Sequence, residues 1–312
     1  MEIIIQLLFV ALGFFLLVKG ADWFVDGACN IATRFHIPQL VIGLTIVAMG
    51  TSAPEAAVSL TAASKGVADI TIGNIVGSNI LNVLVILGLS AVIMPLKVAN
   101  STVKVEIPFM IAITALLYVL GMDGTVNFTD GLILCAAFLL YLGYLLYMAR
   151  KHPDEDGSED PIHPMGIGKA IAALVLGLVL ILIGSDVAVD AATALARIFG
   201  MSERFIGLTI VALGTSLPEL FTSVTAARRG SVDIAIGNIV GSNIFNILFV
   251  VGLSSVIIPV PFAHAFLLDT VVALGAAAFL LVACFRTKIL SRVAGSTMLV
   301  GYAVYLGYLL MK

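Results

Sequence analysis

The chain alternates between long apolar runs and short polar breaks, rather than between single apolar and polar positions. Most runs are about 17–25 residues long, which is the length that an α-helix needs to cross a bilayer. Transmembrane barrel strands are shorter and alternate in polarity, so these runs predict helices. The ten spans that we expect lie at about residues 3–19, 38–62, 69–94, 105–121, 130–149, 167–184, 204–227, 233–258, 266–285 and 293–311.

Two of these apolar stretches occur twice, with an offset of 164 residues. IGLTIVAMGTSAPE at 42–55 returns as IGLTIVALGTSLPE at 206–219, and DITIGNIVGSNILN at 69–82 returns as DIAIGNIVGSNIFN at 233–246. Each copy carries five of the expected spans, and an odd number of spans turns the second copy upside down relative to the first. Inverted repeats are common in secondary transporters, whose binding sites lie near the midplane where the repeats meet. We therefore predict an all-α integral membrane protein of two inverted five-helix repeats.

The two repeats are expected to form one membrane domain around a polar linker. We place the first repeat at residues 1–149, the linker at 150–166 and the second repeat at 167–312. The linker holds the acidic run DEDGSED at 154–160, which lacks the ligand spacing and the closing Glu of an EF-hand loop. It is therefore interpreted as a solvated cytoplasmic connector, too short for a regulatory domain.

The composition agrees with a membrane protein. Hydrophobic residues make up 61% and charged residues 11% of the 312 positions, with a mean hydropathy of +1.15, whereas about 25% of a soluble domain is charged. A net charge of −3 without a basic cluster indicates no nucleic-acid partner. Cys29, Cys135 and Cys284 are scattered and are expected to be packing residues. The sequence shows no nucleophile–base pair and no phosphate loop, so we expect no enzyme, no cofactor and no protein partner.

The distribution of Lys and Arg predicts the orientation in the bilayer. Ten spans place both termini on one side, which together with the even-numbered loops holds four basic residues, against twelve in the odd-numbered loops. Cytoplasmic loops are the ones enriched in Lys and Arg. The odd-numbered loops are therefore expected in the cytoplasm and both termini outside.

A proline interrupts one span at the same point of each repeat. Pro54 and Pro218 lie about halfway along their spans, with Gly50 and Gly214 four residues earlier. Proline removes a backbone donor and crowds the carbonyl four residues before it, so each helix is expected to kink or unwind. Broken helices at membrane depth occur where they line a cavity or an ion site. A matched pair of breaks therefore predicts a transport site.

Each break carries one glutamate, Glu55 in the first repeat and Glu219 in the second. A charged side chain near the bilayer centre costs about 2.5–3.5 kcal/mol even on a lenient insertion scale. No Lys or Arg lies near either break, so the expected counter-charge is a bound cation, or a proton when the site is empty. The alternative interpretation is a pair of protonated glutamates that hydrogen-bond between packed helices.

The groups around the two glutamates are hard oxygen donors. They comprise the hydroxyls of Thr51, Ser52, Thr215 and Ser216, the carbonyls of Ala48 and Ala212 in backbone that we expect to be unwound, and the side chains of Ser78, Asn82, Ser242 and Asn246 in the next spans. Oxygen-only coordination suits Ca²⁺, which takes 6–8 ligands, and also Na⁺. These stretches contain no His or Cys, which argues against zinc or copper. Two carboxylates balance one Ca²⁺, and competition with Na⁺ for shared ligands is the physical basis of an antiporter.

Other polar positions repeat at the same offset. An intramembrane asparagine either lines an ion path or hydrogen-bonds between helices, and both alternatives stand for Asn74, Asn79, Asn238 and Asn243. A hydrated role at the membrane interface is favoured over ion binding for the aspartates near span ends, Asp22, Asp26, Asp186 and Asp190.

The motifs GTSxPE and GNIVGSNIxN, each present twice, resemble the alpha repeats of the sodium/calcium exchanger family in the calcium:cation antiporter superfamily, in its compact prokaryotic form. The resemblance implies a plasma-membrane protein that moves Ca²⁺ against a Na⁺ gradient by alternating access. It implies that the first and sixth helices, here about 3–33 and 167–199, slide across the rigid remainder. The ligands that it implies are Ala48, Thr51, Ser52, Glu55, Ser78, Asn82, Ala212, Thr215, Ser216, Glu219, Ser242 and Asn246.

The resemblance also bears on the coupling ion. Potassium-dependent relatives carry Asp where this chain has Asn246, so the missing charge argues against K⁺ co-transport. The proton/calcium branch typically has Asn-Ala-x-Glu, whereas both repeats here have the sodium-type Thr-Ser-x-Pro-Glu. A proton- or potassium-coupled antiporter on the same scaffold remains the nearest alternative. A cation channel whose two broken helices form a filter is an alternative of another class.

Overall fold

The computed structural model of the protein describes residues 2–151, 164–201 and 212–311. Eight helices in this part are long and apolar enough to cross a membrane, and the bent pair Gln39–Thr51 with Ala53–Ser64 makes a possible ninth span. This confirms the prediction of an all-α membrane protein. The expected span at about 204–227 begins outside the described residues, so the count of ten stays a prediction. The acidic run at 154–160 also lies outside them.

The first repeat contains one long helix, a broken helix and three further spans. Its helices, including the π-helical turns η1 to η3, are α1 (Glu2–Phe35), α2 (Gln39–Ile42), η1 (Gly43–Val47), α3 (Ala48–Thr51), α4 (Ala53–Ser64), α5 (Asp69–Leu81), η2 (Asn82–Leu87), α6 (Gly88–Ile93), η3 (Thr102–Glu106), α7 (Ile107–Leu120) and α8 (Phe128–Lys151).

The second repeat follows the same order where it is described. Its helices are α9 (Ile167–Ile198), α11 (Ala212–Gly214), α12 (Leu217–Arg228), α13 (Val232–Phe245), the π-helical turn η5 (Asn246–Val251), α14 (Gly252–Ile257), α15 (His264–Phe285) and α16 (Arg292–Met311). The π-helical turns η2 and η5 begin at equivalent asparagines, Asn82 and Asn246.

Two small sheets join loops of the two repeats. Strand β1 (Leu96–Lys97) pairs antiparallel with β4 (Ile289–Leu290), and β2 (Thr125–Val126) pairs antiparallel with β3 (Val260–Pro261). The 164-residue offset relates β1 to β3 and β2 to β4, so each repeat contributes one strand to each sheet. This exchange is what a two-fold relation between the repeats produces.

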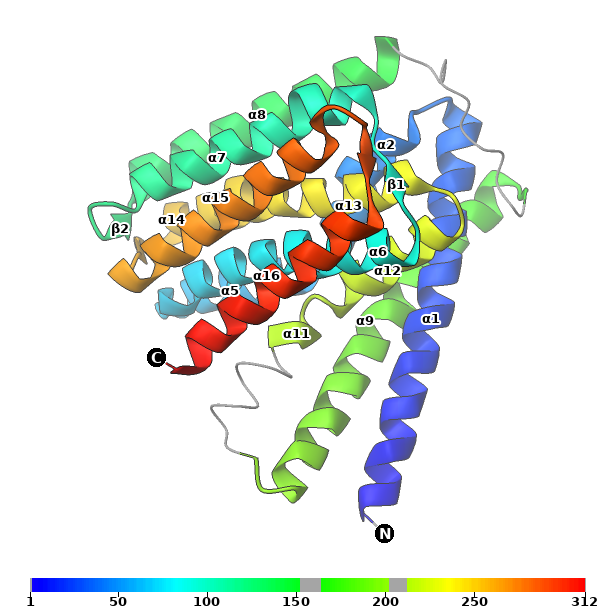
Figure 1. Ribbon diagram of the computed structural model, residues 1–312, viewed down its shortest axis with the longest axis horizontal. Helices are drawn as coiled ribbons and strands as arrows, with labels where there is room; N and C mark the ends of the chain where they lie inside the picture. The colour runs from blue at the N-terminus through cyan, green and yellow to red at the C-terminus, as the bar shows by residue number, and fades with distance from the viewer. Residues whose placement is uncertain (1, 152–163, 202–211, 312) are drawn as a thin grey trace.

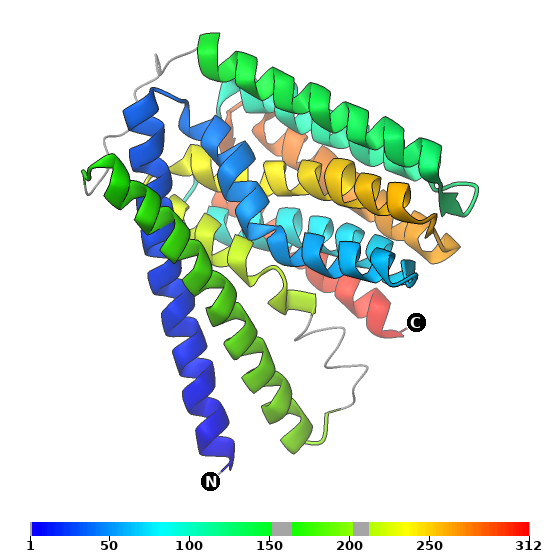
Figure 2. The ribbon, with the colours of Figure 1, turned by 180° about the vertical axis from the view of Figure 1, so that it is seen from behind.

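Helices α1 and α9 lie side by side and project beyond the other helices (Figures 1 and 2). They run antiparallel, since Gly13 faces Ala188 while Gly27 faces Leu174. Their backbones approach closely: a Cβ on Gly177 would lie 2.4 Å from a backbone nitrogen of α1. Small residues permit such contacts between membrane helices. The bounds of both helices agree with the ranges expected for the sliding pair.

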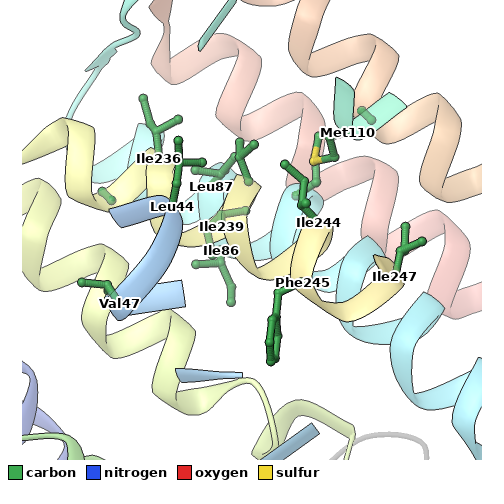
Figure 3. Packing of buried hydrophobic residues seen from close by; sticks show 14 of the residues in the cluster. Leu44, Val47, Ile86, Leu87, Met110, Ile236, Ile239, Ile244, Phe245 and Ile247 are labelled. Carbon is green, nitrogen blue, oxygen red and sulfur yellow. The ribbon is translucent and has the colours of Figure 1, made fainter. Parts of the chain in front are cut away.

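Helix α13 lies at the centre of the fold. Every residue from Ile234 to Phe245 is buried, including the polar Asn238, Ser242 and Asn243. Figure 3 shows Ile239 of α13 among Leu44 of η1 and Ile86 of η2. Helices α3 and α12, which flank the two breaks, both contact α13. The breaks therefore lie against the most buried helix of the protein.

Candidate functional site

The first predicted break lies at Ser52. This residue separates α3 from α4 with φ −82° and ψ 8°, and the helix axes on its two sides differ by 51°. Pro54 lies within the first two positions of α4, where its missing N–H removes no helical hydrogen bond. The proline therefore begins a new helix.

The second break repeats this geometry. Helix α11 ends at Gly214 and α12 begins at Leu217, and Ser216 between them has φ −95° and ψ 7°. Pro218 again lies at the start of the following helix. The hydroxyl of Ser185 on α9 donates a hydrogen bond to the carbonyl of Gly214 at 2.8 Å. Long helix α9 is thereby tied directly to the break.

Ala48 does not lie in unwound backbone, so that expectation is wrong. It begins α3 with φ −60° and ψ −48°, and its carbonyl accepts the backbone N–H of Ser52 at 3.0 Å. The physical reason is that Pro54 crowds only the carbonyl four residues before it, which leaves the preceding turn intact. Ala212 lies in α11, but there the Ser216 N–H bonds to the carbonyl of Leu213 and not to that of Ala212, so the expectation for the Ala212 carbonyl stays a prediction.

The two glutamates occupy one buried site. Glu55 lies in the first turn of α4 and Glu219 in the first turn of α12, where the helix dipole favours negative charge. Each is only 1% exposed. The Ser52 hydroxyl donates to Glu219 Oε1 at 2.8 Å, which links the two broken helices. Glu55 lies beside Thr215 and Ser216, and its carboxylate is close enough to that of Glu219 for their charges to interact.

Four asparagines clamp α5 and η2 to α13 and η5. Asn79 and Asn243 donate to each other's backbone carbonyl, both at 3.2 Å. Asn82 donates to Asn243 Oδ1 at 3.0 Å, and Asn246 donates to Asn79 Oδ1 at 3.1 Å. For Asn79 and Asn243, these bonds assign the interhelical role that the sequence left open. Asn82 and Asn246 make these bonds through their amide nitrogens, whereas their amide oxygens accept no hydrogen bond from the described part of the protein.

The other two asparagines, Asn74 and Asn238, hydrogen-bond to the broken helices. Asn238 donates to Ser223 at 2.9 Å and accepts from the Thr51 hydroxyl at 2.9 Å. Asn74 donates to Ser59 at 3.0 Å. The sequence interpretation missed Ser59 and Ser223. Both lie one turn after a site glutamate at the 164-residue offset, which is the signal that identifies them.

The remaining predicted ligands lie on the same elements. Ser242 of α13 donates to the Ala48 carbonyl at 3.4 Å. The Thr51 hydroxyl, which donates to Asn238 over a shorter distance, lies 3.3 Å from the same carbonyl. Ser78 is buried on α5, one turn before Asn82. The structure thus brings the residues of the two breaks together around the glutamates. Ion coordination by the whole predicted set stays a prediction.

Six buried oxygens of the site have no hydrogen-bond partner in the described part of the chain. They are Glu55 Oε1 and Oε2, Glu219 Oε2, Ser216 Oγ, Asn82 Oδ1 and Asn246 Oδ1. A buried polar atom left unpaired costs about 1–3 kcal/mol, and more when it is charged. All six are hydrogen-bond acceptors, so one bound cation can satisfy several of them at once. The donor set therefore fits a cation.

The chemistry of these oxygens limits which cation fits. Neither Glu55 nor Glu219 belongs to any ion pair recorded among residues 2–151, 164–201 and 212–311. The same residues contain no group of three or more His, Cys, Asp or Glu that could hold a metal ion. Two carboxylates with neutral hydroxyl and amide oxygens match hard cations such as Ca²⁺ and Na⁺ rather than zinc or copper.

Comparison with known proteins agrees with this site. Residues 5–147 and 169–311 each match the family model described as sodium/calcium exchanger protein. The putative antiporter CaxA of Alkalimonas amylolytica is 41% identical over 312 residues, which cover 97% of this chain and 98% of that protein. The sodium/calcium exchanger MaX1 of Methanosarcina acetivorans is 33% identical over 306 residues, covering 86% of this chain and 87% of its own.

A solved structure shares the fold. The sodium-calcium exchanger NCX_Mj, soaked with Na⁺ and Sr²⁺, matches with a TM-score of 0.85 and 31% identity over 98% of this chain and 99% of that one. The protein is thus an integral membrane cation/Ca²⁺ antiporter and not an enzyme. The family match covers nearly the whole of both repeats, so the chain belongs to the sodium/calcium exchanger family.

Proposed function

We propose that this protein exchanges Na⁺ for Ca²⁺ across the plasma membrane by alternating access. The observation that carries the proposal is the group of six unpaired buried oxygens around the break glutamates. The charges of Glu55 and Glu219 balance one Ca²⁺. Na⁺ prefers the same hard oxygens, so the two cations compete for one set of ligands.

Each part of the site has a separate task in this proposal. The two carboxylates supply charge, and the helix N-termini that carry them keep that charge favourable without a basic residue. Ser52 holds one carboxylate oxygen of Glu219. The asparagine clamp fixes the distance between α5 and α13, so the amide oxygens of Asn82 and Asn246 keep their positions while ions exchange.

Two further facts support Na⁺ as the coupling ion. MaX1 and NCX_Mj, which match most of this chain, are both named sodium/calcium exchangers. Asn246 provides an amide where potassium-dependent relatives have a carboxylate, so the site lacks the extra negative charge that would balance a co-transported K⁺ ion.

The test is ⁴⁵Ca²⁺ uptake into proteoliposomes loaded with Na⁺ and diluted into Na⁺, K⁺ or choline buffer. We expect uptake in K⁺ and choline buffer alike, and none in Na⁺ buffer, because only an outward Na⁺ gradient drives the exchange. A requirement for K⁺, or uptake driven by a pH gradient without Na⁺, would replace the proposal with the corresponding coupled antiporter. Uptake that needs no counter-ion would indicate a channel.

A further inference from the structure

An ion-pair cluster ties α1 to the end of α12. The guanidinium of Arg229 donates to Asp22 at 2.8 Å and also to Asp26. The two aspartates lie one turn apart on α1, so the planar fork of one arginine reaches both. The side chains of Arg229, Asp22 and Asp26 are only 19%, 28% and 13% exposed, which weakens screening by water. This cluster joins the first repeat to the second.

The contact continues along α1 beyond the ion pairs. Cys29, one turn after Asp26, lies with its Sγ 3.2 Å from the hydroxyl of Ser231, two residues after Arg229. Cys29 is 6% exposed. The last turns of α1 are thus closed against the loop that follows α12, and the Cys29 thiol reports whether this closure is present.

The 164-residue offset places an equivalent triad at the other end of the helix pair. It carries Asp22 onto Asp186, Asp26 onto Asp190 and Lys65 onto Arg229. Lys65 and Arg229 end their helices with the same backbone, at φ −90° and ψ 0° against φ −89° and ψ 1°. A glycine with positive φ follows each of them.

The second triad is open in this structure. Asp186, Asp190 and Lys65 are all exposed, and none of them takes part in an ion pair recorded for the described residues. Since α1 and α9 run antiparallel, the two triads lie toward opposite ends of the pair. A shift of the pair that separates one triad therefore moves the other triad toward closure.

We propose that the two triads are alternative latches of the transport cycle. Arg229 holds α1 while one side of the site is shut, and Lys65 holds α9 through Asp186 and Asp190 while the other side is shut. The inference rests on alternating access in the proposed function and names the residues that stabilise each state. The lysine ammonium has three donors but no rigid planar fork, so it holds two carboxylates less firmly than arginine does. The Arg229 latch is therefore the stronger one and biases the protein toward the state seen here.

The experiment uses Cys29 as the only thiol, in the C135A/C284A background, which removes the other two cysteines of the chain. The protein is reconstituted in lipid nanodiscs without Ca²⁺, and the rate of alkylation by N-ethylmaleimide is measured. We expect R229Q and D22N/D26N each to raise the rate about tenfold, as expected when a partly buried ion pair is broken. Arg228 is exposed, and R228Q, its matched control, is expected to change the rate by less than about twofold.

The opposite latch is tested in the same assay with substitutions that are far from Cys29. We expect K65R to raise the Cys29 rate, because a second arginine fork stabilises the alternative state. Adding K65Q to R229Q is expected to lower the rate again. An equal effect of R229Q and R228Q would overturn the latch, and a Cys29 rate that is indifferent to K65R and K65Q would overturn the alternation.

This readout needs no ion flux. If Ca²⁺ uptake proves to be coupled to K⁺ or H⁺ while the alkylation rates follow the expectation, the latches stand and only the Na⁺ coupling fails. Conservative R229K keeps a positive charge and is expected to restore part of the protection lost in R229Q, which separates a lost ion pair from a misfolded protein.

Discussion

The two broken helices have almost the same sequence but different hydrogen bonds. Glu219 accepts a hydrogen bond from Ser52 at 2.8 Å. The equivalent contact lies between Ser216 and Glu55, but it lacks the geometry of a hydrogen bond, and the Ser216 hydroxyl and both oxygens of Glu55 are buried without such a bond in the described chain. The two aspartate triads also differ: Arg229 forms ion pairs with its aspartates, whereas Lys65, which is exposed, forms none in the described part of the chain.

At the breaks this difference does not come from residue type, because Ser52 and Ser216 are both serines and Glu55 and Glu219 are both glutamates. At the triads the residue type itself differs, with lysine at 65 and arginine at 229. Under the proposed alternating access, the difference at the breaks comes from conformation, because such a transporter closes one half of its site more tightly than the other at any one time. A ligand shifts such an equilibrium only by its differential affinity for the two states. We therefore expect an incoming cation to gain most at the half that contains the unpaired oxygens of Glu55.

The largest expected effect comes from substituting the two site glutamates, one in each half of the protein. Glu55→Gln or Glu219→Gln removes one of two negative charges at nearly constant volume. We expect either change to reduce ⁴⁵Ca²⁺ uptake by at least about 100-fold, because a single carboxylate no longer balances Ca²⁺ in a buried site. The protein should still be inserted and elute as a single species.

Glu106→Gln is the matched control for those variants. Glu106 is also fully buried, but it lies in η3 and accepts a hydrogen bond from Tyr144 at 2.5 Å, away from the breaks. Its substitution is expected to leave most of the flux intact. Near-normal uptake in E55Q or E219Q would refute the role of the glutamates.

The next prediction concerns the contact between α1 and α9, where equivalent residues of the two repeats make similar close contacts. A Cβ on Gly13 would lie 2.7 Å from the backbone of α9, and one on Gly177 would lie 2.4 Å from the backbone of α1. Gly13→Ala and Gly177→Ala are each expected to lower stability by about 1–3 kcal/mol, as overpacking does, and by similar amounts. Thermal unfolding in detergent measures this, with Gly143→Ala as the control because Gly143 faces open space. Unchanged melting in both variants would contradict the close approach.

The asparagine clamp supplies a second symmetric comparison. Asn79 and Asn243 each make two interhelical hydrogen bonds of equivalent geometry. Asn79→Ala and Asn243→Ala should each cost about 1 kcal/mol, since such bonds in membranes average about 0.6 kcal/mol. Each single variant loses two bonds of its own, but the double variant is expected to depart from the sum of the two, because the residues are in direct contact. Strict additivity would show that the clamp does not act as a unit.

The smallest expected effect tests directly whether the hydrogen bonds of the two breaks differ. Ser52→Ala removes the donor to Glu219, while Ser216→Ala removes a hydroxyl that has no partner in this state. In ion-free buffer, S52A is therefore expected to lower stability by about 1 kcal/mol and S216A by less. Equal shifts in melting temperature would mean that the two halves are alike in solution.

Much of this molecule is predictable from its sequence because membrane helices are long and apolar. The expected ranges of α1, α9 and the broken helix around Ser52 agree with the structure, and the matched prolines indicated the break. The π-helical turns at Asn82 and Asn246 were not predicted, since they depend on how α5 and α13 cross and not on local composition. Nor does the sequence distinguish Glu55 from Glu219, because a conformational difference between equivalent residues leaves no local signal.

Two other features required the tertiary structure. The helical state of Ala48 depends on how far the break at Ser52 extends back along the chain, which a motif does not specify. The pairing of Arg229 with Asp22 and Asp26 joins residues about 200 positions apart, although the repeat offset already placed Arg229 and Lys65 at equivalent points.

The central claim is that Glu55 and Glu219 form one shared cation site. Equilibrium binding of ⁴⁵Ca²⁺ to the purified protein tests it most directly, in the wild type, E55Q, E219Q and the E106Q control. We predict one Ca²⁺ per chain that Na⁺ displaces, lost in E55Q and in E219Q alike and retained in E106Q. Two Ca²⁺ per chain, with each glutamate variant losing only one of them, would contradict the claim.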